Sequence, residues 1–221
     1  GKTLCYNIPV IQRILQNNAA RALYLFPTKA LSQDQVVELN SLIDDLEVKI
    51  GTYTFDGDTP ASARKAVRSA GHIVVTNPDM LHTGILPHHT IWIRLFENLE
   101  FVVIDELHHY RGIFGSHLAN VIRRLKRICA FYGSNPKFIC CSATIANPQE
   151  LAEKVIEDQV TLVDNNGAPG GERHFLFYNP PVVNAELGIR KGAVSEVTRL
   201  AKHFLDRRIQ TIIFARSRLR V

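Results

Sequence analysis

The chain has 221 residues, of which 46% are hydrophobic and 21% charged, so a disordered chain is excluded and a sizeable core is expected. No apolar run approaches the ~20 residues that cross a bilayer, so no membrane association is expected. Lysine and arginine exceed aspartate and glutamate by 26 to 21, and the net charge of +5 is compatible with a polyanionic partner without requiring one.

The sequence predicts strands that alternate with helices, because apolar runs alternate with segments of helical periodicity. This alternation is typical of crossover units and of a largely parallel sheet, which gives an α/β fold. Several runs are apolar on both faces, as buried parallel strands are. The predicted strands are 22–26, 48–53, 72–75, 101–104, 137–141, 160–163 and 210–214.

Two of the predicted helices begin with recognisable N-terminal capping patterns. Ser32 and Gln35 form a capping-box pattern, so a helix is expected to begin there and to bury an apolar stripe. Asn147, Pro148 and Glu150 occupy the N-cap, first and third positions of another predicted helix. The stripe of the first helix consists of Val36, Leu39, Ile43 and Leu46.

A third predicted helix carries a cluster of basic residues. Its apolar stripe consists of Leu118, Val121, Ile122, Leu125, Ile128 and Cys129. The basic residues Arg123, Arg124 and Arg127 fall largely off that buried face, with Lys126 between them. A second basic cluster, at the C-terminus, consists of Arg216, Arg218 and Arg220. For both clusters a solvated surface and a binding surface are equal alternatives.

The strongest loop signal is NNGAPGG at 165–171. A proline-interrupted extended segment follows it, and then a helix is predicted near 193–207. We therefore expect a first domain over 1–180, a linker over 181–192 and the beginning of a second domain over 193–221. Because the chain starts without methionine, it is expected to be a piece of a longer polypeptide.

The four cysteines predict a reducing compartment. They have no C-x-x-C spacing, which argues against a zinc site, and no signal peptide is recognisable, which argues against a secreted disulfide framework. We expect a cytoplasmic, nucleoid or nuclear location. The cysteines are Cys5, Cys129, Cys140 and Cys141.

The stretch FVVIDELHHY places two carboxylates directly after a predicted buried strand. In parallel sheets, ligands bind outside the carboxyl ends of the strands, which is where Asp105 and Glu106 would emerge. An aspartate there can hold Mg²⁺, and a neighbouring glutamate can polarise a water for attack on a phosphate. On the spacing alone, a strand that merely turns polar at the surface is an equal alternative.

The tripeptide Gly1-Lys2-Thr3 is the candidate phosphate-binding element. In a glycine-rich loop that opens a helix, backbone amides and the lysine bind phosphates, and the hydroxyl binds Mg²⁺. Such a tripeptide is a weak signal by itself. Its position ahead of a helix, a strand and then the acidic pair is the order expected in an ATPase.

The histidines suggest a competing hypothesis, a hydrolase with two metal ions. His108 and His109 lie beside the two carboxylates, and histidine is a common metal ligand. No H-x-x-x-H pair on a predicted helix supports such a site, so we rank this hypothesis below the ATPase. Its further ligands would be His82, His88, His89 and His117.

Seven segments resemble, in chain order, the motif series of superfamily 2 DExH-box helicases. They are GKT (1–3), PTKAL (27–31), GDTP (57–60), TNPDML (76–81), DELH (105–108), SAT (142–144) and IIFARSR (212–218). Their surroundings are most similar to the bacterial mitomycin-repair helicase group and its fungal RecQ-related relatives. The resemblance implies a RecA-like P-loop NTPase fold and an ATP-dependent, Mg²⁺-dependent motor that acts in DNA repair. Its partner would be single-stranded or partly duplex nucleic acid, DNA in the 3′ to 5′ direction being favoured over RNA, together with the remainder of the helicase chain.

The resemblance also assigns roles by position. It implies that Gly1, Lys2 and Thr3 bind ATP, that Thr3 and Asp105 bind Mg²⁺, and that Glu106 orients water. The residues that would couple hydrolysis to strand movement are His108, also counted as catalytic, with Ser142 and Thr144. The residues that would bind the nucleic-acid backbone are Thr28, Lys29, Thr76 and Asp79, with Asp58 and Thr59 as weaker candidates. Asp79 and Thr59 are also explained as ordinary caps.

Several family features are missing from the chain. The adenine-recognition segment, the first part of the phosphate loop and the arginine finger of the second domain are absent. An arginine finger contributes about 10³ to 10⁵ in rate where it acts, so the isolated chain is expected to hydrolyse ATP poorly or not at all. A passive nucleic-acid-binding fragment and an RNA helicase therefore remain alternatives.

Overall fold

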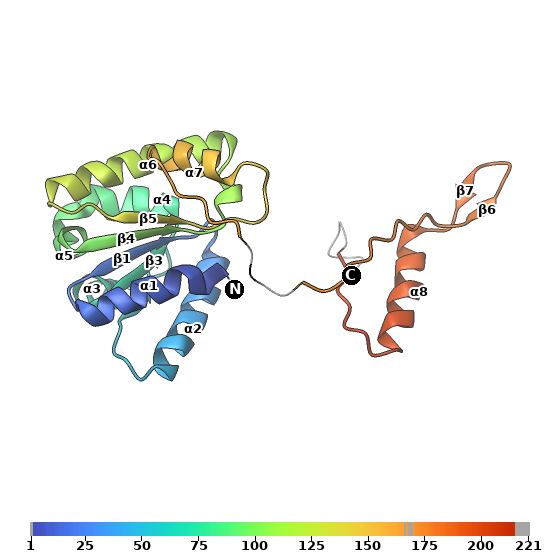
Figure 1. Cartoon of the computed structure of the whole chain (residues 1–221), viewed down its shortest axis with the longest axis horizontal. Coiled ribbons are helices and arrows are strands. Elements are labelled where there is room, and N and C mark those ends of the chain that lie inside the picture. The colour runs from blue at the N-terminus through green and yellow to red at the C-terminus, as the bar shows by residue number, and fades with distance from the viewer. Residues whose placement is uncertain (1, 166, 168–169, 215–221) are drawn as a thin grey trace. The chain divides into compact units, whose positions relative to one another are not determined.

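The structure, a computed structural model, describes residues 2–165, 167 and 170–214. The chain divides into two compact units, Gly1–Asp164 and Asn165–Val221. Figure 1 shows the first as a layered α/β unit and the second as a smaller element set around one helix. The expected domain limits near 180 and 193 stay predictions, because compactness of a unit does not by itself define a domain.

The first unit is built on a five-stranded sheet with the order β2-β3-β1-β4-β5. Every neighbouring pair in it is parallel, as the alternation of apolar runs and helices predicted. Five of the seven predicted strands are confirmed, and the second is shorter than expected. The strands are β1 (Arg21–Leu25), β2 (Thr52–Thr54), β3 (Ile73–Thr76), β4 (Leu99–Ile104) and β5 (Lys137–Cys140).

Helices cover both faces of this sheet (Figure 1). Strand β1 alternates between the two cores: Tyr24 packs with α1 and α2, and Leu23 packs with α6 and α7. The larger helices are α1 (Lys2–Gln16), α2 (Lys29–Asp45), α3 (Ala61–Ala70), α6 (Gly112–Phe131) and α7 (Pro148–Ile156). The shorter ones are α4 (Pro78–Met80), η1 (Leu81–Ile85), η2 (Leu86–Ile91), α5 (Ile93–Glu97) and η3 (Leu107–His109). No helix in the described part of the chain is both long and apolar enough to span a membrane.

The start of α2 differs from the prediction. The helix begins at Lys29, and Thr28 is its N-cap, with a side-chain oxygen that accepts from the amide of Leu31 at 3.4 Å. Ser32 lies inside the helix, where its hydroxyl donates to the carbonyl of Thr28 at 3.1 Å. Thr28 lies in extended backbone after Pro27, so it takes the cap position first.

The two other helix predictions are confirmed in position. Helix α7 begins at Pro148 after Asn147, although the Asn147 side chain donates to Glu150 at 3.0 Å instead of capping a backbone amide. The predicted stripe of α6 is buried, with Ile128 partly so.

The predicted strands 160–163 and 210–214 are wrong. Residues 161–163 and 212–214 are exposed, and neither segment is paired with a strand. A strand exists only where a neighbour supplies its hydrogen bonds, and an apolar run alone does not specify one. The described part of the second unit contains one hairpin, β6 (Val182–Asn184) with β7 (Ile189–Arg190), inside the predicted linker. The predicted helix after it is confirmed as α8 (Ala193–Leu205).

Candidate nucleotide and nucleic-acid site

The candidate site lies at the carboxyl ends of the central strands. Because β1, β4 and β5 are parallel, the residues that follow them meet at one edge of the sheet. Backbone bonds continue the pairing past the strands: the amide of Asp105 donates to Leu25 at 3.1 Å, and that of Cys141 to Ile104 at 2.9 Å. Asp105 therefore leaves the sheet at an interior strand, between β1 and β5.

The start of α1 reaches the same edge. The Tyr6 hydroxyl donates to Oδ2 of Asp105 at 2.9 Å, across 99 positions of sequence. The Lys2 ammonium donates to the carbonyl of Ser142 at 3.1 Å. Lys2 and Asp105 therefore both lie at this edge of the sheet. Gly1, the first residue of the predicted phosphate-binding tripeptide, lies outside the described residues.

Asp105 is held in place from two sides. It is 7% exposed, and its Oδ1 accepts from the amide of Glu106 at 2.7 Å while its Oδ2 accepts from Tyr6. Burial, and secondarily the Asp105 charge, raise the pKa of Tyr6, so the phenol keeps its proton. Each carboxylate oxygen has a second lone pair, which leaves acceptor capacity for a cation.

This donor set fits Mg²⁺, which proteins usually bind through one or two carboxylates together with substrate phosphates and water. Asp105 supplies a fixed carboxylate, and half-buried Thr3 lies on the first turn of α1, one turn before Tyr6. In the described part of the chain, no three His, Cys, Asp or Glu side chains gather to form a metal site. The dinuclear hydrolase hypothesis therefore lacks a ligand set.

Glu106 turns the chain away from the strand. Its backbone is left-handed, with φ 50° and ψ 44°, a conformation that is uncommon outside glycine and often found at functional sites. The turn places Oε2 of Glu106 3.2 Å from Nδ1 of His108. The amide nitrogen of Ala143 lies 3.3 Å from the same ring nitrogen, within hydrogen-bonding distance. The DELH and SAT segments are therefore in direct contact.

The two predicted coupling residues in the SAT segment differ in their surroundings. The hydroxyl of Ser142 is buried and has no hydrogen-bond partner among the described residues. Thr144 is exposed. An unpaired buried hydroxyl costs free energy, so Ser142 is a position where a rearrangement or a ligand would supply the missing bond.

The predicted nucleic-acid residues of the first two segments follow β1 and β2, at the same edge. Lys29 forms an ion pair with Asp58, which joins the PTKAL and GDTP segments. The Thr28 oxygen caps α2. The Thr59 hydroxyl lies 3.2 Å from Asp56 Oδ1 and accepts from the Asp56 amide at 2.9 Å, so it stabilises its own turn.

The two predicted residues after β3 also differ from each other. Thr76 is 1% exposed, and its hydroxyl donates to the carbonyl of Phe55 at 2.6 Å. This hydroxyl therefore joins β3 to the residue that follows β2, and a role of Thr76 in binding nucleic acid stays a prediction. Asp79 has an 80% exposed side chain, and its Oδ1 lies 3.4 Å from Nε2 of His117.

Sequence reasoning missed Tyr6, and it named His117 only as a candidate metal ligand and not as a neighbour of Asp79. Tyr6 had a usable signal, since its spacing of four residues from Lys2 puts both on one face of a helix. His117 lies on α6, where no sequence spacing relates it to Asp79. Only the packing of α6 beside α4 brings the two together.

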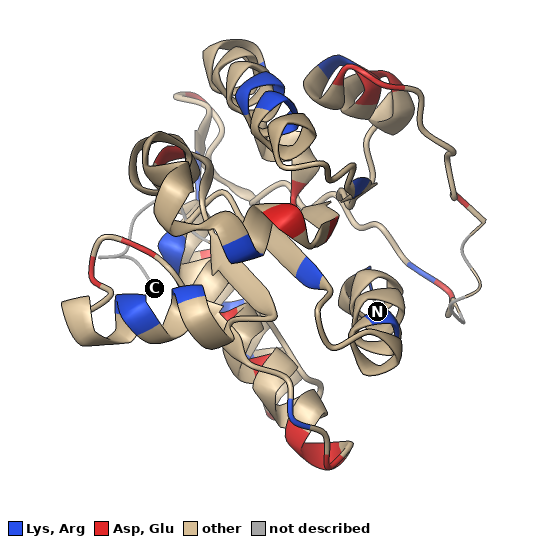
Figure 2. Ribbon diagram, turned by 90° about the vertical axis from the view of Figure 1, so that its left-hand side faces the viewer, with Lys and Arg blue, Asp and Glu red and all other residues tan. Residues whose placement is uncertain are grey.

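The basic cluster on α6 lies along the helix that is uppermost in Figure 2, which carries basic bands and no acidic ones. Nε of Arg123 donates to Glu157 at 2.7 Å, and Lys126 lies 3.7 Å from Asp158. These bonds attach α6 to the residues that follow α7. Nη1 of Arg124 also donates to the carbonyl of His82, at 3.4 Å, so three of the four basic residues are bonded within the fold.

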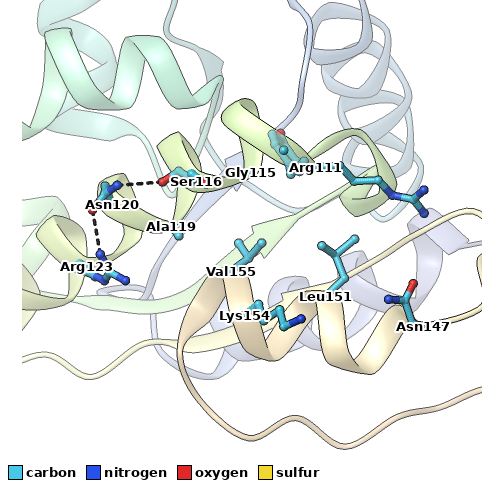
Figure 3. Close-up of a pocket in the computed structure, with 12 residues that line it drawn as sticks. Arg111, Gly115, Ser116, Ala119, Asn120, Arg123, Asn147, Leu151, Lys154 and Val155 are labelled. Carbon is cyan, nitrogen blue, oxygen red and sulfur yellow. Dashed lines mark hydrogen bonds between the residues drawn. The ribbon is translucent and has the colours of Figure 1, made fainter.

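A groove of about 620 Å³ separates α6 from α7 (Figure 3). Its polar lining residues include Arg111, Asn120, Arg123, Asn147 and Lys154. None of its lining residues is a predicted site residue. The predicted chemistry therefore lies at the strand ends and not in this groove.

Residues 1–151 match the DEAD/DEAH box helicase family. Over all 221 residues the chain is 65% identical to YprA, an uncharacterized ATP-dependent helicase of Bacillus subtilis (strain 168), and it covers 30% of that protein. It is 40% identical over 225 aligned residues to the ATP-dependent helicase hrq1 of Schizosaccharomyces pombe, with 99% of this chain and 21% of the relative covered. The chain therefore spans less than a third of the length of these curated relatives.

Solved structures agree with these sequence relationships. The crystal structure of the DUF1998 helicase MrfA bound to DNA and AMPPNP superposes with a TM-score of 0.94 at 64% identity, over 100% of this chain and 30% of that one. The DEAD-box helicase Mss116, at 22% identity and a TM-score of 0.59 over 72% of this chain and 33% of that one, shares the fold alone. The parallel sheet is thus a RecA-like helicase fold, as the motif series implied. Since the family match extends over more than half of its residues, the chain belongs to the DEAD/DEAH box helicases.

Proposed function

We propose that the polypeptide carrying this chain is an ATP-dependent DNA helicase that moves along one strand from 3′ to 5′. This chain would supply the part of the motor that binds ATP and Mg²⁺. The observation that carries the proposal is the 2.9 Å hydrogen bond from Tyr6 on α1 to Asp105 after β4. The bond places α1, which begins at Lys2, beside the acidic pair. A triphosphate bound near the acidic pair would then be within reach of the start of this helix.

In this proposal each side chain at the sheet edge has one task. Lys2 binds the phosphates, Thr3 and Asp105 bind Mg²⁺, and Glu106 orients the attacking water. Held by these two side chains, Mg²⁺ would supply positive charge to offset the charge on the phosphates. Contact between Glu106, His108 and the SAT segment offers a route by which hydrolysis is sensed at the next strand. The residues proposed to couple hydrolysis to movement are His108, Ser142 and Thr144.

The preference for DNA rests on the relatives. MrfA, at 64% identity, was solved with DNA and AMPPNP, and the fungal relative is named an ATP-dependent helicase. The proposed contacts to the strand come from the segments after β1, β2 and β3, where Lys29 is the main cation. Such contacts to phosphates are independent of sequence. The remaining candidates on these segments are Thr28 and Asp79, with Thr59 through its turn and Asp58 through its ion pair with Lys29.

The test is nucleotide hydrolysis by the complete natural polypeptide, with Lys2→Ala as the variant. Lys137, exposed at the opposite end of β5, gives the matched control Lys137→Ala. Phosphate release is measured without nucleic acid, with single-stranded DNA and with single-stranded RNA. Unwinding of duplexes with a single 3′ or 5′ tail then reports the direction.

We expect DNA to stimulate hydrolysis in the wild type and in Lys137→Ala, and Lys2→Ala to abolish it. If RNA stimulated hydrolysis and DNA did not, the protein would be an RNA helicase and the proposed preference for DNA would be wrong. A wild type that binds DNA without hydrolysing ATP would instead be a passive binder, and the proposal would fail.

A further inference from the structure

We infer that Tyr6 is a positioning residue for the Mg²⁺ of the nucleotide site, an inference that rests on the proposed function. It would act through Asp105, to which its hydroxyl donates at 2.9 Å, and not by touching the nucleotide itself. No motif assigned a role to this tyrosine, because its partner lies on another element.

The ring of Tyr6 has a fixed position. It is 1% exposed, and it packs edge-on against Tyr24 with ring centroids 5.4 Å apart and an interplanar angle of 89°. Tyr24 is in turn anchored by donating its hydroxyl to Asn7 on α1 at 3.0 Å. A ring clamped in this way offers its hydroxyl at one place only, so the Asp105 carboxylate is oriented by the core of the protein.

The single proton of the Tyr6 hydroxyl has two acceptors nearby. Oε1 of Gln35 lies at 3.2 Å and Oδ2 of Asp105 at 2.9 Å. The carboxylate takes the proton, because a bond to a charged acceptor is shorter and stronger than a bond to a neutral amide. Thr3, the other residue proposed to bind Mg²⁺, lies three residues before Tyr6 on α1.

This arrangement resembles the outer shell of metal sites, in which a hydrogen-bonded partner fixes the orientation of a ligating carboxylate. Asp105 has such a partner on each oxygen, since the Glu106 amide donates to Oδ1 at 2.7 Å. The amide belongs to the backbone and stays in every variant. Removing the Tyr6 hydroxyl therefore frees one oxygen of Asp105 and leaves the other bound.

The test uses Tyr6→Phe in the complete natural polypeptide, with Tyr24→Phe as the matched control. Both changes remove one buried phenolic hydroxyl and keep the ring, but only the first touches Asp105. Equilibrium binding of a fluorescent AMPPNP analogue is measured while Mg²⁺ is titrated, and again in excess chelator. Thermal unfolding is recorded for each protein, and binding is measured well below the unfolding transition.

We expect Tyr6→Phe to raise the Mg²⁺ concentration for half-maximal binding about tenfold, the lower end of the loss typical for such partners. Binding in chelator should not change, and Tyr24→Phe should titrate like the wild type. An unchanged Mg²⁺ midpoint in Tyr6→Phe, or an equal shift in Tyr24→Phe, would overturn the inference. So would a Tyr6→Phe protein that unfolds where Tyr24→Phe does not. If the nucleotide affinity of the wild type did not change with Mg²⁺ concentration, the proposed function would be overturned as well. The two failures are therefore distinguishable.

Discussion

Oε2 of Glu106 lies 3.2 Å from Nδ1 of His108, and the amide nitrogen of Ala143 lies 3.3 Å from that same ring nitrogen. A ring nitrogen that donates to a carboxylate has no lone pair left to accept from an amide. Only one of the two contacts is therefore a hydrogen bond at a given moment. His108 can thus pair with the acidic residue or with the SAT segment, and the proton on Nδ1 decides which.

The first prediction concerns the charge of Glu106. Glu106→Gln keeps the shape of the side chain but removes its ability to take a proton from water. We expect nucleotide binding to persist while the turnover number falls by about 10² to 10⁴, the usual contribution of a general base. Steady-state phosphate release and equilibrium nucleotide binding in the complete polypeptide measure the two effects separately.

Glu97→Gln is the control, because Glu97 is an exposed carboxylate at the end of α5. It should leave both quantities unchanged. If Glu106→Gln weakened nucleotide binding but left the turnover number of the bound nucleotide unchanged, the role proposed for Glu106 would be wrong.

The second prediction concerns the ion pair between Lys29 and Asp58. A phosphate that binds Lys29 must compete with the Asp58 carboxylate. We expect Lys29→Ala to weaken binding of single-stranded DNA uniformly across sequences. The slope of log affinity against log salt should drop by about 0.7 to 1 in magnitude, as for the loss of one phosphate contact. Asp58→Asn should strengthen binding, since it removes the competing charge.

Fluorescence anisotropy with labelled oligonucleotides at several salt concentrations measures both variants. Lys137→Ala, at the opposite edge of the sheet, serves as the control and should not alter the slope. Weaker binding by Asp58→Asn would show instead that Asp58 itself helps to hold the strand.

The third prediction concerns pH and the second unit. Glu196 is 3% exposed; its Oε2 accepts from the Tyr178 hydroxyl at 2.6 Å and from Arg199 at 3.0 Å. The pKa of Glu196 is lowered to about 2, mainly by the hydrogen bond from Tyr178 and next by that from Arg199. The pKa of a glutamate in the unfolded chain is about 4.3, higher than in the folded protein. The ionised carboxylate therefore stabilises the fold fully at pH values above about 4.3. The stabilisation is lost as the pH falls toward about 2.

We expect Glu196→Gln to reduce the amide protection of α8 at neutral pH, and to flatten its dependence on pH in the acid range. Hydrogen exchange followed by NMR is suitable, because the single tryptophan, Trp92, lies in the other unit and cannot report on this one. Glu186→Gln changes an exposed carboxylate nearby and should have no effect. Equal pH dependence in the wild type and in Glu196→Gln would contradict the assignment.

Local patterns in the sequence were enough to predict a largely parallel sheet with the five observed strands among seven expected, the buried stripe of α6 and the position of Asp105 at a strand end. These features depend on the alternation of apolar residues, which is written into contiguous segments. The motif order likewise predicted the family. The same local reasoning failed at 160–163 and 210–214, where apolar runs had no neighbouring strand, and at Ser32, where Thr28 took the cap position.

Only the tertiary structure decided what the predicted side chains touch. The bond between Tyr6 and Asp105 joins residues 99 positions apart, and the hydroxyl of buried Thr76 donates to the carbonyl of Phe55, which follows the neighbouring strand. Hydrogen bonds act over about 3 Å, so their partners are set by how strands and helices pack and not by distance along the chain. The sequence alone thus determined which groups line the sheet edge, and the packing of α1 against β4 determined which of them act together.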